Sequence, residues 1–386
     1  MKWELTTIGE QCIVTSSKRV HLSERSDEGV PFYCSKEIIQ KYKGEEITEC
    51  DHIREETYTE IAQKFGVPQE NDLLVTTRGT IGIPYLYRNT DRFYFADGNL
   101  TWMKNFKKTM LPQYLYYWFL THEGQKKVEA IAKGTAQKAV PIAGIKGLKI
   151  SLPSIAKQRQ IIGVLSAYDN FIENNQKQIK LLEEAAQRLY KEWFIDLRFP
   201  GHETTPIVDG VPEGWEKVEV GTCIAKIART KQVMTAELLD VGRIPVVDQS
   251  RSFVAGYTND EETIVDLGTP IIVFGDHTRV LKYIQFPFAK GADGTQLIVT
   301  NNEKMPQSLF YCSLVNVDLS NYHYARHFKY LKAEEILLPS LDVAHQFDGV
   351  VSPLFEQVQM LRDKCKLAAE ARDRLLPKLM SGEIEV

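Results

Sequence analysis

The chain has 386 residues, of which 43% are hydrophobic and 25% are charged, and these values predict a globular protein of two or three domains. No apolar run reaches the ~20 residues of a membrane span, the N-terminus lacks a signal-peptide core, and the six cysteines are scattered without CxxC spacing, so we expect a cytoplasmic protein without membrane contact, zinc or disulfides. The net charge of −4 does not point to nucleic acid, so DNA binding would need locally clustered cations or partners that share the contact.

An internal repeat organises the chain. The segment 152–189 matches the segment 338–375 without a gap, 186 residues later, and both copies begin with Leu-Pro-Ser. Shorter motifs ahead of each copy also recur, among them Gly9 as Gly221 and Asp97-Gly98 as Asp293-Gly294. Such a repeat predicts duplicated structural units. The order that we expect is globular domain, helix, globular domain, helix.

The first globular domain is predicted over residues 1–153, with mixed α/β structure. A buried strand at 72–77 runs into a polar turn whose small residues and arginine suit a close approach to DNA, although ordinary hairpin turns share this composition. The stretch 104–149 holds nine lysines and two acids, and the aromatic residues at 114–119 indicate a core helix. The loop at 134–138 offers a glutamine for adenine and a lysine for phosphate or guanine. The candidate DNA-binding residues here are Thr77, Arg78, Gly79, Thr80, Thr135, Gln137 and Lys138.

A long helix is predicted over residues 154–197, with Ser154 as its N-cap. Its apolar residues are spaced alternately by four and three, which is the seam of a two-stranded coiled coil. We expect the seam to contain Ile161, Leu165, Tyr168, Ile172, Asn175, Ile179, Leu182 and Leu189. Asn175 is either a buried amide that fixes the register of the coil or a residue at a solvated point of it.

A linker at 198–212, rich in Pro, Gly and Thr, leads to a second mixed α/β domain at 213–339. A buried strand at 269–274 again runs into a polar turn, at 275–279. A cationic and aromatic cluster at 322–329 occupies the place that the 134–138 loop has in the first copy. Charge runs are usually solvated faces, but two of them at equivalent positions favour DNA contact. The candidates are His277, Thr278, Arg279, Tyr324, Arg326, His327 and Lys329.

The second long helix is predicted over residues 340–386, with Ser340 as its N-cap and Pro377 ending or kinking it. Its copy of the seam includes Val351, Leu354, Val358, Leu361 and Leu375. Because a lone amphipathic helix would expose its apolar stripe, we expect the two helices to pair with each other. The predicted fold class is therefore α+β: two mixed α/β domains separated by two long helices that form an antiparallel coiled coil, with a pseudo-two-fold internal repeat.

Motifs for the chemistry of DNA modification are missing from the sequence. There is no Pro-Pro pair or Gly-x-Gly for a methyltransferase, no Asp-x-Lys or Glu-x-Lys for a common nuclease, and no Walker A loop for a translocase. The histidines show no HxH or HExxH metal spacing. We therefore expect no catalytic residues and no bound metal.

The segment 134–194 resembles the central conserved region of the specificity subunits of type I restriction-modification systems. The ending LLPKLMSGEI at 375–384 resembles their C-terminus, and VPEGWEKVEVG at 211–221 resembles the usual start of their second target-recognition domain. The resemblance covers the whole chain. The loop at 134–138 matches the pattern of the family well, whereas the second domain has Tyr-Ala-Arg-His at 324–327.

The resemblance implies that each domain is a target-recognition domain that reads one half of a split site in double-stranded DNA. It also implies that the paired helices space the two halves and dock two methyltransferase subunits, and that restriction and translocase subunits complete the complex. S-adenosylmethionine is expected on the methyltransferase, with no cofactor bound by this chain. The alternative is an orphan coiled-coil DNA-binding or scaffold protein without enzyme partners.

Overall fold

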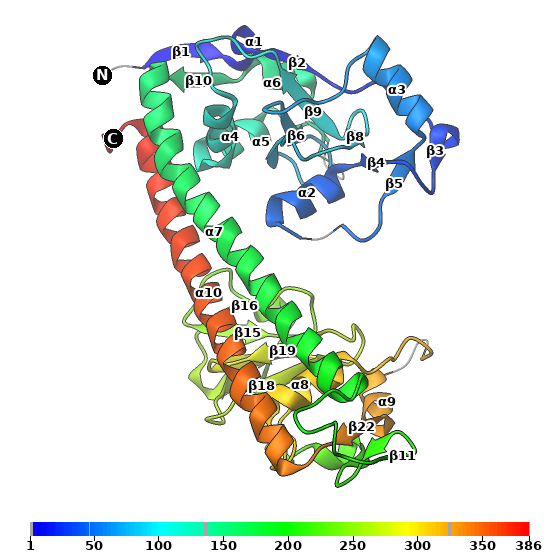
Figure 1. Ribbon diagram of the computed structural model, residues 1–386. Coiled ribbons are helices and arrows are strands. Elements are labelled where there is room, and N and C mark those ends of the chain that lie inside the picture. Colours follow the sequence, from blue (N-terminus) through cyan, green and yellow to red (C-terminus); the bar gives the residue numbers. More distant parts are fainter. Residues whose placement is uncertain (1–2, 46, 135–137, 323–325, 386) are drawn as a thin grey trace. The chain divides into compact units, whose positions relative to one another are not determined.

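The computed structural model describes residues 3–45, 47–134, 138–322 and 326–385 (Figure 1). The chain forms two compact units, of which the first contains Met1–Asn174 and Cys365–Val386 and the second contains Asn175–Lys364. Each unit combines one globular domain with part of each of two long helices, α7 (Ile155–Tyr190) and α10 (Leu341–Ser381). Within the described residues, no helix has the length and apolar character that crossing a bilayer requires.

Three sheets form the first globular domain. Strands β1 (Glu4–Thr7) and β10 (Lys149–Leu152) pair antiparallel. A four-stranded antiparallel sheet has the order β2 (Ile13–Thr15), β9 (Leu100–Lys104), β6 (Leu73–Thr76), β7 (Pro84–Leu86). The third sheet has the order β3 (Arg25–Ser26), β5 (Asp51–Ile53), β4 (Val30–Tyr33), β8 (Tyr94–Phe95), and β4 runs parallel to β8. The helices are α1 (Ile8–Gln11), α2 (Ser35–Lys43), α3 (Glu55–Lys64), α4 (Pro112–Leu120), α5 (His122–Ala130) and α6 (Ile142–Gly147), with a 3₁₀ turn, η1 (Leu22–Glu24).

The second globular domain repeats this plan. Strands β13 (Glu216–Glu219) and β22 (Glu335–Leu338) pair antiparallel, and the central sheet has the order β19 (Leu281–Ile284), β18 (Ile271–Gly275), β21 (Thr295–Ile298). The third sheet has the order β14 (Gln232–Val233), β20 (Phe288–Gly291), β15 (Ile244–Val247), β16 (Gly256–Thr258), with β17 (Ile264–Val265) also on β20. The helices are α8 (Gln307–Val315) and α9 (His327–Ala333), and the 3₁₀ turns are η3 (Val220–Cys223), η4 (Thr235–Glu237) and η5 (Glu261–Thr263).

The segment predicted as a linker has some regular structure of its own. Ahead of it, within the helix predicted over 154–197, a π-helical turn, η2 (Lys191–Ile195), directly follows α7. A short hairpin then forms from β11 (Ile207–Val208) and β12 (Val211–Pro212).

The recurring glycines, Gly9 and Gly221, lie at equivalent close contacts in the two domains. A side chain at Gly9 would place its Cβ 3.1 Å from the carbonyl oxygen of Lys146, and one at Gly221 would place it 3.0 Å from the carbonyl oxygen of Lys332. Both lysines lie in the short helix that precedes the last strand of their domain. The turn after the first strand therefore packs directly on that helix in both domains, and glycine leaves the room for it.

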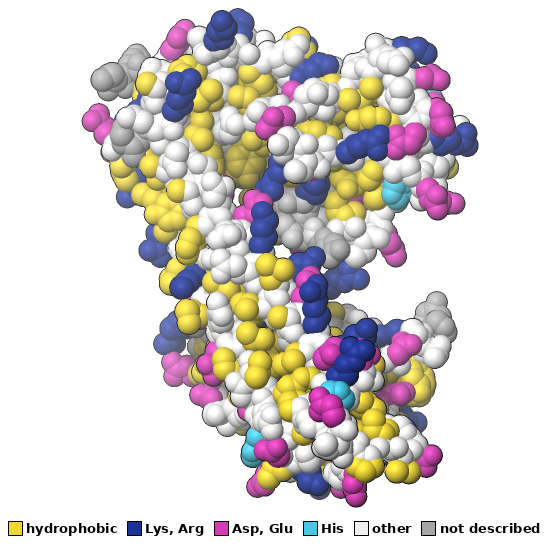
Figure 2. Space-filling view, viewed as in Figure 1, with side chains coloured by type: hydrophobic (Ala, Val, Ile, Leu, Met, Phe, Trp, Pro, Cys, Tyr) yellow, Lys and Arg dark blue, Asp and Glu magenta, His cyan; other side chains and the backbone are white. Residues whose placement is uncertain are grey.

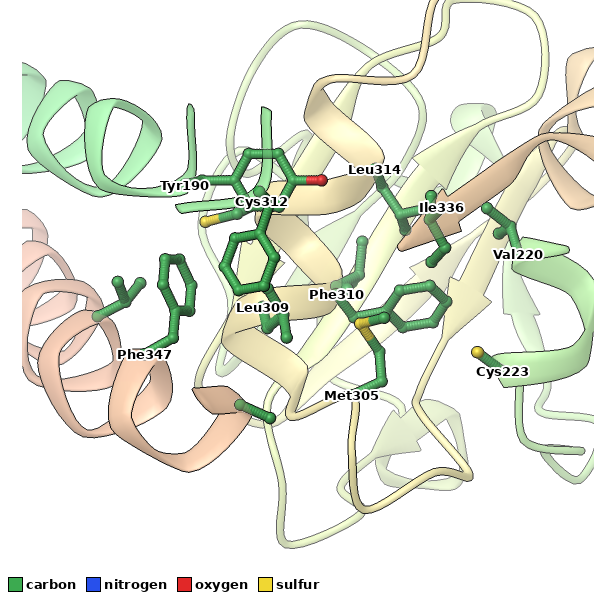
Figure 3. Packing of buried hydrophobic residues seen from close by; sticks show 14 of the residues in the cluster. Tyr190, Val220, Cys223, Met305, Leu309, Phe310, Cys312, Leu314, Ile336 and Phe347 are labelled. Carbon is green, nitrogen blue, oxygen red and sulfur yellow. The ribbon is translucent and has the colours of Figure 1, made fainter. Parts of the chain in front are cut away.

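The buried aromatic helix of each domain ties the sheet to the long helices. The core helix predicted at 114–119 is confirmed as α4, in which Tyr114, Leu115 and Phe119 are fully buried. Its counterpart α8 buries Leu309, Phe310 and Cys312. Figure 3 shows Tyr190 of α7 and Phe347 of α10 directed toward these α8 side chains. One contiguous core thus joins domain and helices in the second unit, and a similar cluster does so in the first.

The helices pack antiparallel in each unit, as predicted. In the first unit, Arg372 Nη1 lies 2.6 Å from Asp169 Oδ1, and Cys365 Sγ lies 3.7 Å from the carbonyl oxygen of Ile172. In the second unit, Arg362 Nη2 lies 2.6 Å from Glu183 Oε1. The predicted seam residues are all buried or half-buried: Ile161, Leu165, Tyr168, Ile172, Asn175, Ile179, Leu182 and Leu189 on α7, and Val351, Leu354, Val358, Leu361 and Leu375 on α10.

The ends of the long helices agree only partly with the predictions. Ser154 Oγ accepts a hydrogen bond from the backbone N–H of Lys157 at 3.4 Å, as an N-cap does. Pro377 does not end α10, which continues to Ser381. Leu379 and Met380 of the final turn are buried in the core of the first unit. Their burial offsets the hydrogen bond that proline removes from a helix.

Candidate nucleic-acid interface

In the first domain, the structure brings the two predicted DNA-binding segments together. The backbone N–H of Val140 donates to the carbonyl oxygen of Thr77 at 2.8 Å, and the N–H of Gly79 donates to the carbonyl oxygen of Lys138 at 3.2 Å. The N–H of Thr77 donates to the carbonyl oxygen of Asn99 at 2.8 Å. The turn after β6, the turn before β9 and the segment before α6 therefore form one surface.

The predicted residues of this surface differ in exposure. Arg78, Gly79, Thr80 and Lys138 are exposed. Thr77 is only 3% exposed, and its backbone N–H and carbonyl groups both form hydrogen bonds within the domain. Thr77 therefore holds the turn in place and does not itself present a side chain to DNA. Thr135 and Gln137 lie outside the described residues.

Lys138 has an acidic neighbour that sequence reasoning missed. It forms an exposed ion pair with Glu129 at the end of α5, and this pairing lowers the pKa of the Glu129 carboxyl. Arg78 has no ion pair within the described part of the chain. Arg78 is therefore free to contact an anion, whereas Lys138 must first exchange Glu129 for it.

In the second domain, the equivalent segments also meet. The carbonyl oxygen of Asp276 accepts from the backbone N–H of His327 at 2.9 Å, and its Oδ1 accepts from the N–H of Phe328 at 2.8 Å. Arg279 Nη2 donates to the carbonyl oxygen of Tyr322 at 3.0 Å. Two domains with different loop sequences thus hold the same pair of loops side by side.

His327 is not available to DNA in this structure. It is 4% exposed, its Nδ1 lies 2.9 Å from the carbonyl oxygen of Asp276, and its Nε2 lies 3.0 Å from that of Tyr322. A neutral ring has one N–H and bonds one of these acceptors, and a protonated ring bonds both. The prediction that His327 contacts DNA directly is therefore wrong for this structure. The buried ring instead connects the two loops through its hydrogen bonds.

The remaining candidates of the second domain lie on its surface. His277, Thr278, Arg279, Arg326 and Lys329 are exposed, and Tyr324 lies outside the described residues. Thr278 Oγ1 donates to the carbonyl oxygen of Gln249 at 2.6 Å. No ion pair within the described ranges involves Arg326 or Lys329. These two cations are therefore free to contact an anion.

Two glutamines that hold the loops were missed by sequence reasoning. Gln125 Nε2 donates to the carbonyl oxygen of Gly82 at 2.8 Å and so fixes the far end of the first turn. Gln249 Oε1 accepts from the N–H of His277 at 3.1 Å, and its Nε2 donates to the carbonyl oxygen of Asp293 at 3.0 Å. The recurring Asp-Gly motif marked the turn beside Gln249, but no pattern marked Gln249 itself.

The outward faces of the long helices carry hydrophobic side chains (Figure 2). Leu181 and Leu367 are 63% and 65% exposed, and they occupy equivalent positions of the internal repeat. Phe171, Val350 and Met360 are exposed as well. Phe171 and Leu367 belong to the first unit, and Leu181, Val350 and Met360 belong to the second. The predicted interface residues all lie on the inner seam, so these exposed apolar side chains were missed.

Side chains for metal binding are not gathered anywhere in the described ranges, where no group of three or more His, Cys, Asp or Glu is arranged to hold an ion. The exposed residues of the interface include cations, and its loops also present amide and backbone groups. Such groups can bind phosphate and base edges.

Comparison with known proteins finds relatives with one common description. Residues 1–184 match the family described as the type I restriction modification DNA specificity domain. The type I restriction enzyme MjaIX specificity subunit of Methanocaldococcus jannaschii is 26% identical over 345 residues, which are 81% of this chain and 78% of the relative. A putative type I specificity subunit of Mycoplasma genitalium is 24% identical over 332 residues, or 82% of each chain.

A solved structure agrees in fold. The crystal structure of a type I restriction-modification S subunit from M. genitalium aligns over 98% of this chain and 96% of its own, with a TM-score of 0.57 at 16% identity. With two duplicated mixed α/β domains and paired long helices, the chain is similar over about four fifths of its length to specificity subunits of type I restriction enzymes, and its residues 1–184 match their DNA specificity domain.

Proposed function

We propose that the chain is the DNA-recognition and assembly subunit of a type I restriction-modification complex. Each globular domain reads one half of a bipartite site in double-stranded DNA, and the paired helices dock two methyltransferase subunits. Restriction and translocase subunits join the complete complex. The chain itself binds no cofactor, S-adenosylmethionine belongs to the methyltransferase, and the complex works in the cytoplasm, where its DNA is.

The pair of loops held together in both domains carries this proposal. Each pair exposes cations: Arg78 and Lys138 in the first domain, and Arg279, Arg326 and Lys329 in the second. Arginine and lysine contact phosphates and can read guanine in the major groove. Local clustering of this kind accounts for a DNA-binding protein with a net charge of −4. Because the loop sequences differ, the two domains are suited to different half-sites.

Exposed hydrophobic side chains on the long helices of both units support the docking of protein subunits. Apolar side chains such as Leu181 and Leu367 are stabilised when a partner covers them, and their equivalence in the repeat suits two copies of one partner. An orphan scaffold would also carry such side chains. Co-purification with a type I methyltransferase subunit from the same genome distinguishes the two functions, because an orphan protein forms no such complex.

The test of DNA reading uses the assembled methyltransferase complex and duplexes mutated in one half-site at a time. Changing Arg78 or Arg326 to Ala should weaken binding through the half-site of its own domain. A lost phosphate contact should reduce the salt slope by about one unit, and a lost base contact should relax specificity at one position by ~1–3 kcal/mol. The matched control is Lys64→Ala, an exposed lysine of α3 that is paired with Glu60. Unchanged affinity and specificity in both arginine variants would contradict the proposed interface.

A further inference from the structure

A five-residue loop, 248–252, follows β15 and is closed by a buried lysine. Lys282 Nζ donates to the carbonyl oxygens of Asp248 at 2.8 Å and Ser252 at 2.5 Å, so one amine ties both ends of the loop. The Lys282 side chain is only 4% exposed. Asp248 Oδ1 accepts from the backbone N–H and the hydroxyl of Ser250, at 2.9 and 2.6 Å. The backbone of the loop is thus fixed from inside the domain.

The same loop is fastened to the candidate DNA surface by Gln249. Its side chain bonds the backbone of His277 and of Asp293, and its carbonyl oxygen accepts from the Thr278 hydroxyl. These three partners lie in the turn after β18 and in the turn before β21. The loop 248–252 is therefore part of the surface that includes the cationic turn 275–279.

Two glycines show how closely these segments pack. A Cβ at Gly275 would lie 2.1 Å from Thr278 Oγ1 and 2.9 Å from the Cβ of Gln249. A Cβ at Gly291 would lie 2.5 Å from the Cβ of Asp248. Neither position has room for a larger residue, so the loop is held in place by packing as well as by hydrogen bonds.

Arg251 lies near the tip of this fixed loop and is exposed. It has no ion pair or hydrogen bond with any residue that the structure describes. The Asp248 and Asp276 carboxylates nearby are occupied by hydrogen bonds, which leaves Asp293 as the exposed acid of the adjoining turn. His277 and Arg279 are exposed in the turn that Gln249 contacts, so Arg251 adds a cation to a surface that already suits a polyanion.

We propose that the loop 248–252 is a further DNA-contacting segment of the second domain, in which Arg251 contacts the DNA and Gln249 is a positioning residue. The proposal rests on the proposed function. A fixed loop loses little conformational entropy when its arginine binds, which favours a defined contact over a solvated side chain. In the first domain, β4 is the counterpart of β15, because each is paired parallel with another strand of its sheet, β8 or β20. No loop like 248–252 follows β4, because α2 begins directly after it, at Ser35. The proposed contact is therefore made only by the second domain, at the second half-site.

The experiment compares Arg251→Ala with Arg243→Ala in the assembled methyltransferase complex. Arg243 is an exposed arginine of the same domain whose guanidinium is paired with Glu261, so its variant controls for the loss of one positive charge. We expect Arg251→Ala to weaken binding about fivefold or more and Arg243→Ala to change it little. A smaller salt slope identifies a phosphate contact, and relaxed specificity within the second half-site identifies a base contact. Either result supports the proposal.

Two further variants separate the possible failures. If Arg326→Ala weakens binding while Arg251→Ala matches the wild type, the proposed function stands and this inference is overturned. If Arg251→Ala, Arg326→Ala and Arg78→Ala all leave DNA binding unchanged, the proposed function and the inference fail together.

Gln249→Ala tests positioning. It should reduce discrimination at the second half-site while leaving the first half-site and the thermal unfolding of the complex unchanged. A merely structural role would instead lower the unfolding temperature or weaken both half-sites equally, and that outcome would remove Gln249 from the proposal.

Discussion

Lys282 is a buried cation whose environment disfavours its charge. Burial lowers the pKa of Lys282 to about 8, and the Asp248 carboxylate, 3.8 Å away, opposes this shift only in part. The ordinary value of 10.5 applies to the unfolded chain. Between these two values the unfolded state binds more protons than the folded state, so the free energy of unfolding rises with pH. Below pH 8 the charged amine destabilises the fold by a constant amount.

Lys282→Met should remove this pH dependence. We expect the free energy of unfolding of the wild type, relative to the variant, to increase from pH 8 toward pH 10. Chemical denaturation at several pH values measures the difference, and the comparison cancels the tyrosines and cysteines that also titrate in this range. A constant difference across the range would show that the amine keeps its ordinary pKa in the folded protein. The variant also loses the two hydrogen bonds to the loop 248–252, and this loss lowers its stability without a dependence on pH.

The ion pair of Glu129 and Lys138 sets a second test at the scale of single residues. In DNA binding, a phosphate must compete with the Glu129 carboxylate for Lys138. Glu129→Gln should therefore strengthen DNA binding by a few fold at low salt and less at high salt, because both interactions are screened. The control is Glu123→Gln, which frees Lys127 on the same helix. Weaker binding by Glu129→Gln would indicate instead that the carboxylate itself contacts a base.

At the scale of secondary-structure elements, the helix seam contains one polar residue with an apolar equivalent. Asn175 is 4% exposed, and its Nδ2 has no hydrogen-bond partner among the described residues. The equivalent position of the repeat is Leu361, which is 5% exposed. The burial of Asn175 is consistent with an amide that fixes register rather than with a solvated point, and the register role remains a prediction.

Asn175→Leu should stabilise the protein by about 1–3 kcal/mol, because the unsatisfied buried amide is removed. If the amide fixes register, the variant should also form mispaired species that size-exclusion chromatography resolves. The control is Asn174→Leu, which changes an exposed neighbour and should leave stability nearly unchanged. A loss of stability on Asn175→Leu would indicate that the Asn175 amide forms a stabilising hydrogen bond in solution, and would contradict the prediction.

At the scale of the whole molecule, each globular domain begins and ends with two strands that pair with each other. Strand β13 pairs with β22 in the register Glu216 with Leu338, and β1 pairs with β10 in the register Glu4 with Leu152. The first and last strands of a domain are therefore neighbours, and the long helix follows directly. A domain of this construction can be exchanged by cutting the chain at its first and last strands, which lie next to each other in space.

Replacement of residues 215–337 by the matching segment of a relative should change the second half of the recognised site and leave the first half unchanged. Methylation mapping of a genome modified by the chimeric complex measures both halves at once. The reciprocal exchange of residues 3–151 serves as the control and should change only the first half. A change in both halves after one exchange would contradict reading by separate domains.

The amino-acid sequence by itself determined the features that repeat or have a period. The copy of 152–189 at 338–375 predicted the duplication, and the alternating spacing of apolar residues predicted which side chains of α7 and α10 face inward. The strands before the two polar turns and the core helix α4 also follow from local composition. Periodicity reports burial directly, because one face of a helix or strand packs and the other meets water.

Only the tertiary structure decided which residues of the candidate site meet and which of them are accessible. The sequence suggests an exposed cation at His327, but the ring is buried and lies against the carbonyl oxygens of Asp276, 51 residues away, and of Tyr322, five residues away. Gln249 and Lys282 carry no sequence signal, because their partners lie 28 to 44 and 30 to 34 residues away along the chain. Pro377 remains helical because the next turn is buried. Contacts between segments that are remote in sequence depend on how the strands pair, and local patterns do not record that pairing.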